Sequence, residues 1–575
     1  FVSGRPGILS KAGFQGSMTK DRMIKEMVLR AWQRASDDGK IRSKPDPDKV
    51  LVEIPKETVP ADYATTVAMV LAPIEGRPPR EIAQTIQSYL QGDPQAILEH
   101  VELAGPGYLN VTLKPDQWRQ VLLDIDAQGK RFGQVKIGCG RRVQVEFVSA
   151  NPTGPLHVGH GRWAAVGNAL ANLLCAAGYE VHREYYNNDS GRQVKLLGQS
   201  VYARYQQRAG NPVTDPEDGY RGAYVTELAQ QLMDRVGDVY RAKKAEECLD
   251  FFTRTALDEM TALIRKDLEA FGITFDSWFS EASLFESGAV QKALDDLRKK
   301  NYLYEKDGAL WFRSTQFSDD KDRVVRKEDG EFTYLASDIA YHQDKLSRGF
   351  DLLINIWGAD HHGYMARMEA VVLALGYPKE KLRILIGQLV TLVRNGQPVP
   401  MSKRAGEFVT LRDVVSEVGK DAAIFFFLMR RLDSHLEFDL ELAKRQSNEN
   451  PVYYVQYAHA RLCSVLRQAE EQGIGLKDAS QIRLDRLTEP EELKLMKRLD
   501  AFPKLIEESA HALEPHRLTF YLLELAGILH HYYHKHRIIS DDSDLTQARL
   551  LLVNSVRTVM ANALGILGVS APERM

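Results

Sequence analysis

The sequence predicts a multidomain α/β protein, with a small α+β region at the N-terminus, an α/β middle and an all-α C-terminal part. Three observations lead to this fold class. At 575 residues the chain is too long to fold around one hydrophobic core. Strand and helix patterns alternate from about residue 141 to about residue 445, which is typical of a parallel sheet covered by helices. Residues 451–575 carry several long helical patterns and almost no strand signal.

The composition is that of an ordinary globular protein, with 44% hydrophobic and 27% charged residues. The formal net charge is −3, so any contact with nucleic acid must come from local basic patches. The four cysteines lie far apart without CxxC or Cys/His spacing, which argues against structural zinc and disulfides and fits a cytoplasmic protein. The apolar stretch 422–429 is too short to cross a bilayer, so we expect no membrane partner.

The N-terminal part predicts a domain of its own. Residues 1–17 look like a tag or vector remnant before Met18 and are left out of the fold prediction. Apolar residues between positions 19 and 36 recur at helical spacing and predict an amphipathic helix. Shorter strand and helix patterns follow as far as Leu113, which together predict a small α+β domain.

The middle region opens with a strand–helix–strand pattern. Residues 142–148 alternate as a strand, a loop leads to His157, and a helical pattern then ends at Gly178. Residues 180–186 form the second strand pattern. In such a βαβ unit the ligand crevice lies where the first strand ends and the helix begins.

Two histidines bracket a glycine at the start of this predicted helix. The free N–H groups and positive end of a helix favour a polyphosphate. Gly159 leaves room for a flat ring such as adenine to approach the backbone. His157 and His160 could donate hydrogen bonds to phosphate oxygens as charge develops in a transition state. The alternative is a surface histidine pair with other partners.

A second signal lies about 240 residues later along the chain. Residues 351–357 predict a strand that ends at Gly358, and Asp360 after it suits a ribose hydroxyl or, equally, a helix N-cap. A further strand, 382–389, leads to an Asn-Gly hairpin and then to a basic loop that contains Lys403. A mobile loop of this kind can bring a point charge to a bound triphosphate, although alone it would be taken for an exposed basic loop.

His157-Val-Gly-His160 and Met401-Ser-Lys-Arg404 resemble the two signatures of class I aminoacyl-tRNA synthetases. The resemblance is closer to one family, the arginyl-tRNA synthetases, and covers roughly residues 18–575. The blocks that carry it are residues 145–155, 185–191, 334–341, 451–461 and 571–575. Pro400 stands where the family's second signature usually opens with a lysine, which bears on one phosphate contact and leaves Lys403 in place.

The resemblance implies a Rossmann-type parallel-sheet catalytic domain with insertions, a small α+β N-terminal domain and an all-α C-terminal helical bundle. The domains implied are 18–130, which contacts tRNA; 131–445, which is catalytic and interrupted at about 201–331; and 446–575, which binds the anticodon. The implied reaction joins L-arginine to tRNA(Arg) through an arginyl-adenylate, using ATP with Mg²⁺ and releasing pyrophosphate and AMP. We expect a monomer without an editing domain and without DNA as a partner, in which activation of arginine depends on bound tRNA.

The resemblance also implies roles for individual residues. The catalytic residues would be His157, His160 and Lys403. ATP would be bound by Pro155, Gly159, Gly358, Asp360, Met401 and Ser402. Arginine would be bound by Glu146, Asn151, Tyr334, Asp338 and His361, and we expect no resident metal. Tyr334 and Asp338 are four apart and share a helix face, but Glu146 could also be solvent-facing and Asp338 an ordinary helix carboxylate.

Two basic segments stay open to more than one interpretation. Residues 530–537 are rich in histidine, but their apolar surroundings favour helix packing and RNA backbone contact over a metal site. Basic residues between Lys130 and Arg142 could contact RNA or form a solvated linker. The rival functions are a cysteine or glutamate synthetase, a small-molecule nucleotidyltransferase and a non-catalytic RNA-binding relative. Amino-acid-dependent ATP–pyrophosphate exchange would separate them.

Overall fold

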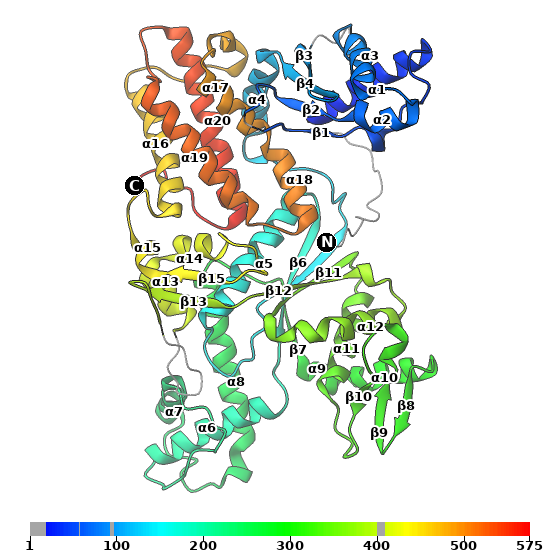
Figure 1. Ribbon diagram of the computed structural model, residues 1–575. Helices are drawn as coiled ribbons and strands as arrows, with labels where there is room; N and C mark the ends of the chain where they lie inside the picture. Colours follow the sequence, from blue (N-terminus) through cyan, green and yellow to red (C-terminus); the bar gives the residue numbers. More distant parts are fainter. Residues whose placement is uncertain (1–18, 57, 93–96, 400–408) are drawn as a thin grey trace. The chain divides into compact units, whose positions relative to one another are not determined.

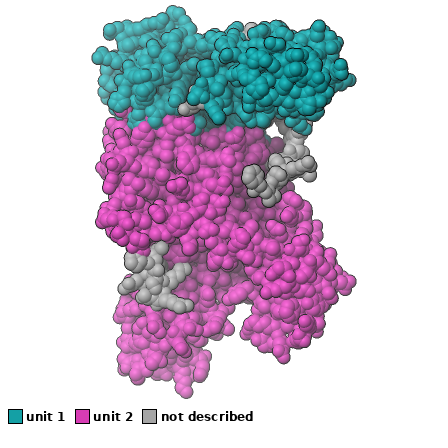
Figure 2. All heavy atoms as spheres, viewed as in Figure 1, with its two compact units in different colours: residues 1–136, 462–504, 527–559 teal, residues 137–461, 505–526, 560–575 magenta. Residues whose placement is uncertain are grey.

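The computed structural model describes residues 19–56, 58–92, 97–399 and 409–575. The chain divides into two compact units, coloured separately in Figure 2. Unit 1 contains residues 1–136, 462–504 and 527–559, and unit 2 contains residues 137–461, 505–526 and 560–575. The predicted tag remnant and the predicted site residues Met401, Ser402 and Lys403 lie outside the described residues.

A five-stranded parallel sheet forms the centre of unit 2 (Figure 1). In spatial order its strands are β12 (Leu382–Gly387), β11 (Leu352–Gly358), β5 (Arg142–Glu146), β6 (Glu180–Asn187) and β7 (Ser277–Ser280). The predicted βαβ unit is confirmed, because helix α5 (Val158–Ala176) connects β5 to its parallel neighbour β6. Gly178 ends the connection in the left-handed region, at φ +85°. The predicted Rossmann-type fold is therefore present, although β5 ends two residues earlier than expected.

The interval 201–331 does not lie wholly outside this sheet. Helix α6 (Arg192–Arg208), which begins before the interval, shares one hydrophobic core with α7 (Ala223–Val236) and α8 (Ala245–Ala270). Strand β7 follows α8 and pairs with β6, so the interval also supplies an edge strand of the sheet.

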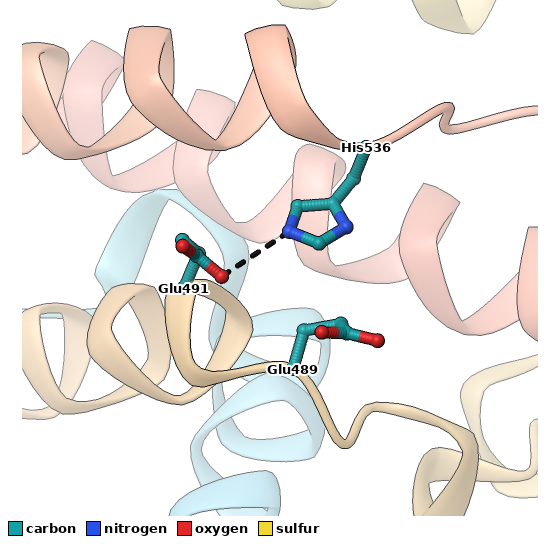
Figure 3. Close-up of side chains that lie close together, drawn as sticks. All are labelled: Glu489, Glu491 and His536. Carbon is teal, nitrogen blue, oxygen red and sulfur yellow. Dashed lines mark hydrogen bonds and ion pairs between the residues drawn. The ribbon is translucent and has the colours of Figure 1, made fainter.

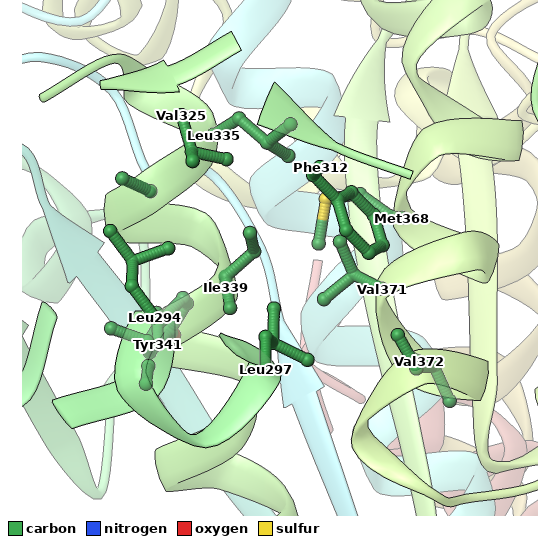
Figure 4. Packing of buried hydrophobic residues seen from close by; sticks show 14 of the residues in the cluster. Leu294, Leu297, Phe312, Val325, Leu335, Ile339, Tyr341, Met368, Val371 and Val372 are labelled. Carbon is green, nitrogen blue, oxygen red and sulfur yellow. The ribbon is translucent and has the colours of Figure 1, made fainter. Parts of the chain in front are cut away.

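A second core packs the next segment against the sheet (Figure 4). The core contains Leu294 and Leu297 of α10, Ile339 of α11, Phe312 of β9 and Met368 of α12. The elements concerned are α9 (Glu281–Glu286), α10 (Ala289–Lys299), α11 (Tyr334–Ser347), α12 (Met365–Leu375), β8 (Leu303–Lys306), β9 (Ala309–Phe312) and β10 (Arg323–Arg326). This core fixes α11, which carries two of the predicted arginine-binding residues.

The predicted Asn-Gly hairpin is confirmed in a small sheet of three strands. Asn395 and Gly396 both have positive φ, +53° and +75°, as a tight two-residue turn requires. The sheet contains β13 (Val390–Arg394), β14 (Gln397–Pro398) and β15 (Leu436–Asp439), with helices α13 (Leu411–Val418), α14 (Lys420–Phe427) and α15 (Leu440–Lys444) nearby in the chain. The turn residues of the hairpin dictate this geometry locally, which is why the sequence predicted it.

Unit 1 confirms the α+β prediction for the N-terminal part. Its antiparallel sheet has the order β1 (Val52–Glu53), β2 (Tyr63–Thr65), β4 (Tyr108–Leu113) and β3 (Leu98–Ala104). Its helices here are α1 (Lys20–Asp37), α2 (Val67–Glu75), α3 (Pro79–Gln91) and α4 (Pro115–Gln128). The buried residues of α1 include Ile24, Val28 and Trp32, on the face that its apolar spacing predicted.

Segments far apart in the sequence are joined inside unit 1. Lys20 of α1 pairs with Asp500, and Asp21 accepts from the Lys504 side chain at 2.8 Å. Asp62, which is buried, pairs with Lys497 and accepts a hydrogen bond from the Leu113 amide. These pairs bind the N-terminal α+β part to helices from the last quarter of the chain.

The C-terminal residues are helical, as predicted. The helices are α16 (Pro451–Glu471), α17 (Pro490–Asp500), α18 (Phe502–Ala512), α19 (Arg517–Lys535) and α20 (Ser543–Leu567). By length and composition α20 could cross a membrane, a feature that the sequence analysis overlooked. However, 61% of its most apolar window is buried within the protein, and Leu551 and Val556 are fully enclosed. Its apolar character is that of a core helix.

Candidate active site

The chain leaves β5 through a strained turn. Val148 and Ser149 have φ of +70° and +40°, in the left-handed region that a β-branched residue such as valine strongly disfavours. The turn is held by Tyr185, whose hydroxyl donates to the Ala150 carbonyl at 2.8 Å, and by Ser149 Oγ, which accepts from the Tyr186 amide at 3.2 Å. Glu146 is therefore the last residue of its strand, at the carboxyl edge of the sheet.

Two histidines cap the helix that follows. His157 Nδ1 accepts a hydrogen bond from the Gly159 amide at 3.0 Å, and His160 Nδ1 accepts one from the His157 amide at 3.3 Å. This reciprocal arrangement satisfies backbone donors at the start of α5. Because each Nδ1 acts as an acceptor, a neutral ring carries its proton on Nε2. Both imidazoles are thereby set to donate from Nε2.

The two imidazoles are stacked, with ring centroids 3.7 Å apart. A Cβ atom on Gly159 would lie 2.9 Å from His157 Cε1, so the folded-back imidazole itself requires glycine here.

A tryptophan links this pair to the ends of two strands. Trp163 lies edge to face with His160, at a centroid distance of 5.4 Å. Gly358 of β11 and Gly387 of β12 are paired in register, and Cβ atoms there would lie 2.9 Å and 2.3 Å from the indole. The two glycines thus form a seat for Trp163, and through it they fix the place of His160 beside the strand ends.

The segment after residue 408 is anchored beside the histidines. Thr410 forms an isolated β-bridge with His157, and the Leu411 amide donates to the Leu156 carbonyl at 2.7 Å. Thr410 also caps α13 in a reciprocal pair with Asp413. After the residues that the structure does not describe, the chain therefore resumes beside the capped start of α5.

A row of polar residues runs across one face of the sheet, over β5 and its neighbouring strands. Asn355, Glu146, Glu184 and Ser277 are register partners on four neighbouring strands, so their side chains share one face. Asn355 and Glu184 are fully buried, and Glu146 is 5% exposed. The solvent-facing alternative for Glu146 is therefore wrong: the strand has helices on both faces.

Helix α11 meets this row with its own polar residues. Lys345, fully buried, pairs with Glu146 and donates to Asn355 Oδ1 at 3.0 Å. Arg348 binds both oxygens of Glu184, at 2.6 and 2.9 Å, and Tyr341 adds a third donor at 2.7 Å. Burial opposes ionisation, but the hydrogen bonds from Arg348 and the charge of Lys345 hold the pKa of Glu184 at about 2.

Asp338 lies on α11 in a different environment. Its carboxylate accepts from the Tyr364 hydroxyl at 2.5 Å. Burial, together with the nearby charges of Glu281 and Glu146, raises the pKa of Asp338 to about 7. Glu281 is itself buried and accepts from Ser190 Oγ at 2.7 Å. Asp338 therefore lies close enough to Glu281 and Glu146 for their charges to act on it.

The remaining predicted residues lie closer to solvent. Tyr334, one turn before Asp338, is 66% exposed, and Asn151 is exposed and donates to Gln193 Oε1 at 2.6 Å. His361 and Asp360 are exposed neighbours, 3.5 Å apart, and Asp360 is not the N-cap of its helical turn (Ala359–Tyr364). Pro155 is half-buried in the loop before α5.

The sequence analysis missed several residues of this region: Trp163, Glu184, Glu281, Lys345 and Tyr364. A signal existed for one of them. Lys345 follows Asp338 by seven residues, with Tyr341 between them, so all three fall on one face of a helix. No local pattern points to the others, because their partners are distant in the chain.

A cluster of possible metal ligands lies elsewhere, in unit 1. Glu489, Glu491 and His536 bring ligand atoms within 4.8 Å of one another (Figure 3). Lys535 Nζ lies 2.6 Å from Glu491 and supplies positive charge there. The Lys535 and His536 contacts hold the pKa of Glu491 at about 2. The arrangement is an ion-pair cluster that connects α17 to the end of α19.

Three family models match this chain. The class I tRNA synthetase (R) catalytic domain matches residues 121–427, the arginyl-tRNA synthetase N-terminal domain matches 22–113, and the DALR anticodon-binding domain matches 455–575. The catalytic match contains the histidine pair, the polar row and Asp338.

Curated relatives are similar along nearly the whole length. An arginine–tRNA ligase from Syntrophotalea carbinolica is 50% identical over 552 residues, 96% of this chain and 99% of the relative. One from Citrifermentans bemidjiense is 49% identical over 553 residues, with the same coverage of both chains. The arginyl-tRNA synthetase structure from Thermus thermophilus, at 24% identity, shares the fold with a TM-score of 0.73 over 97% of this chain and 100% of that one. This chain therefore belongs to the arginyl-tRNA synthetases, class I enzymes that use ATP to attach arginine to tRNA.

Proposed function

We propose that the capped start of α5 binds the phosphates of ATP and stabilises the transition state of adenylate formation. The observation that carries this proposal is the reciprocal capping of His157 and His160, which occupies each Nδ1 and so leaves the proton of a neutral ring on Nε2. Two donors fixed in advance are well suited to charge that develops on phosphate oxygens. Lys403 supplies a further charge from its loop, and Pro155, Gly159, Gly358, Asp360, Met401 and Ser402 complete the nucleotide site.

In the first step the carboxylate of arginine attacks the α-phosphorus of ATP. A carboxyl O–P bond forms, the bond to the bridging oxygen breaks, and pyrophosphate leaves with its electron pair. In the second step a ribose hydroxyl of the tRNA terminus attacks the carbonyl carbon, and AMP leaves. Because the substrates supply both nucleophiles, the protein contributes position and charge.

Magnesium enters as the complex of Mg²⁺ with ATP. Asp360 is exposed and is the carboxylate among the described residues of the proposed nucleotide site. A single carboxylate fits a cation that is held mainly by phosphate oxygens and water. When bound, Mg²⁺ offsets the charge of the departing pyrophosphate.

Arginine is selected by the acidic pocket beyond β5. Asp338 accepts the guanidinium, Glu146 supplies further acceptor sites, Tyr334 closes over the side chain from the start of α11, and Asn151 and His361 contact the rest of the amino acid. A guanidinium presents five donors in a fixed fork, so two carboxylates can satisfy it together. Lysine would leave part of this acceptor set unpaired, which supports discrimination without a separate editing reaction.

The rest of the chain serves the tRNA substrate. Residues 131–445 form the catalytic domain, residues 18–130 contact the tRNA, and residues 446–575 bind the anticodon; we further propose that the enzyme acts as a cytoplasmic monomer and does not bind DNA. The segment 530–537, which is helical as far as Lys535, contributes packing through Tyr532, which is buried and donates to Glu492, and RNA contact through its exposed residues.

The test is ATP–pyrophosphate exchange with each of the twenty amino acids, with and without total tRNA. We expect exchange with arginine alone and only when tRNA is present. Exchange with another amino acid would overturn the pocket assignment. Exchange with arginine in the absence of tRNA would overturn the dependence on tRNA and leave the pocket intact.

A further inference from the structure

The two buried glutamates on neighbouring strands differ in how many donors they receive. Glu184 accepts five hydrogen bonds, from Gln144, Ser277, Tyr341 and both terminal nitrogens of Arg348. A carboxylate has about four lone-pair sites, so Glu184 has no capacity left for a substrate. Among the described residues, Glu146 accepts from Lys345 and from Ser149 Oγ, the latter at 3.2 Å. Glu146 therefore keeps acceptor capacity.

All three N–H donors of the Lys345 ammonium group have partners in this region. Its side chain is completely buried, and its three donors meet Glu146, the Asn355 side-chain oxygen at 3.0 Å, and the face of the Tyr341 ring, 4.3 Å from the centroid. Asn355 is oriented in turn by His342, whose Nε2 lies 3.1 Å from Asn355 Nδ2. Burial and the charge of Lys345 lower the pKa of His342 to about 3, so this imidazole is neutral and accepts at Nε2.

We infer that Lys345 is a positioning residue of the arginine site, which holds one oxygen of Glu146 so that the other faces the guanidinium of the substrate. This inference rests on the proposed role of Glu146. A buried carboxylate without a partner would take up a proton or rotate toward another donor. By pairing with one oxygen only, Lys345 fixes the direction of the Glu146 carboxylate.

The chain contains a matched control in Arg348. Arg348 follows Lys345 by three residues, comes from the same helix end and pairs with the glutamate on the next strand. If pairs of this kind serve only to attach α11 to the sheet, the two basic residues should behave alike. If Lys345 acts on substrate, its loss alone should change the affinity for arginine.

The experiment compares Lys345→Met, Lys345→Arg and Arg348→Met in the full chain by steady-state aminoacylation and thermal unfolding. For Lys345→Met we expect the KM for arginine to rise roughly tenfold or more, with the KM for ATP within about twofold. Lys345→Arg restores most of the arginine affinity. Arg348→Met lowers the unfolding temperature but leaves the KM for arginine within about twofold. An equal rise in both methionine variants, or no rise in Lys345→Met, would overturn the inference.

A second set of variants covers the case in which Lys345→Met fails to fold. Glu146→Gln removes the charge that Lys345 balances, so Glu146→Gln/Lys345→Met carries no unpaired buried ion. Because Lys345 acts through Glu146, adding Lys345→Met to Glu146→Gln should not raise the KM for arginine further. A further tenfold rise would contradict the positioning role. An unchanged KM in Glu146→Gln alone would instead contradict the proposed role of Glu146, which keeps the two failures distinct.

Discussion

Asp338 differs from the other acidic residues of the pocket because no described cation pairs with it. Glu146 has Lys345 and Glu184 has Arg348, whereas Asp338 has the Tyr364 hydroxyl and two carboxylate neighbours. With its pKa raised to about 7, Asp338 is half-protonated near neutral pH. A guanidinium would replace the missing positive charge, and its binding should be coupled to loss of that proton.

This coupling predicts a pH-dependent affinity for arginine. The pKa of Asp338 is raised to about 7, and the proposed pairing with a guanidinium requires the ionised form. Lowering the pH from 8 to 6 should therefore raise the KM for arginine roughly tenfold, since the protonated fraction grows as the pH falls below the pKa. The measurement is the KM at half-unit pH steps. Asp338→Asn should raise the KM throughout and flatten its pH dependence; a profile as steep as that of the unmodified enzyme would assign the proton to another group.

The capping histidines allow a separation of structure from catalysis. Asparagine at position 160 can keep the hydrogen bond to the His157 amide, as asparagine does at helix caps, but its amide does not reach as far as Nε2. His160→Asn should lower kcat for ATP–pyrophosphate exchange by about 10²–10³ with little change in the unfolding temperature. His160→Ala should lose similar activity and about 1 kcal/mol of stability as well. Full activity in His160→Asn would argue against transition-state donation from Nε2.

At the level of elements, the nucleotide side depends on how α5 meets β11 and β12. Trp163 comes from the first turns of the helix, and its seat comes from paired glycines on two strands about 200 residues later. The position of His160 is thus set by three elements together. A substitution at Gly358 or Gly387 should therefore displace the Trp163 indole, and through it His160.

Gly387→Ala tests this connection. Its added methyl group would lie 2.3 Å from Trp163 Nε1, which should cost about 1–3 kcal/mol of stability and lower kcat for exchange. In a Trp163→Leu background the same change should cost at least about 1 kcal/mol less, measured by a double-mutant cycle in urea. Gly363→Ala is the control, because a Cβ atom there meets nothing within 4 Å. Additive effects of Gly387→Ala and Trp163→Leu would contradict the seat.

The elements that the sequence predicted correctly are those whose structure is determined by residues close together in the chain. The βαβ unit follows from alternation, helix periodicity and a glycine stop within some 45 residues, and the hairpin follows from its Asn-Gly turn. Glu184 could not be found in this way. Its importance comes from strand register, which aligns Glu146 with Glu184, 38 positions later, and with Asn355, 209 positions later. Register in a parallel sheet leaves no mark in a single strand.

At the scale of the whole molecule, the proposed catalytic residues that the structure describes all belong to unit 2. Unit 1 contains its own ion pairs between distant segments, such as Asp62 with Lys497. Changes to these pairs should therefore affect stability and leave the chemistry unchanged.

Lys497→Met provides this test. Asp62 is almost fully buried, so removal of its partner should lower the free energy of unfolding by roughly 1–3 kcal/mol. Because Lys497 is partly exposed to solvent, we expect a value near the lower end of this range. The KM values for arginine and ATP should stay within about twofold of those of the unmodified enzyme. A large rise in either KM at normal stability would show that unit 1 influences the pocket directly.

The pairing of Lys20 with Asp500 also bears on how the protein is made. The two residues are 480 positions apart. At translation rates of about 5–20 residues per second, helix α1 leaves the ribosome roughly 25–100 s before its partner exists. During that interval the surface of α1 that later pairs with Asp500 has no partner to cover it. Nascent chains of this enzyme should therefore be most accessible to proteases and chaperones until the segment that contains Asp500 has emerged from the ribosome.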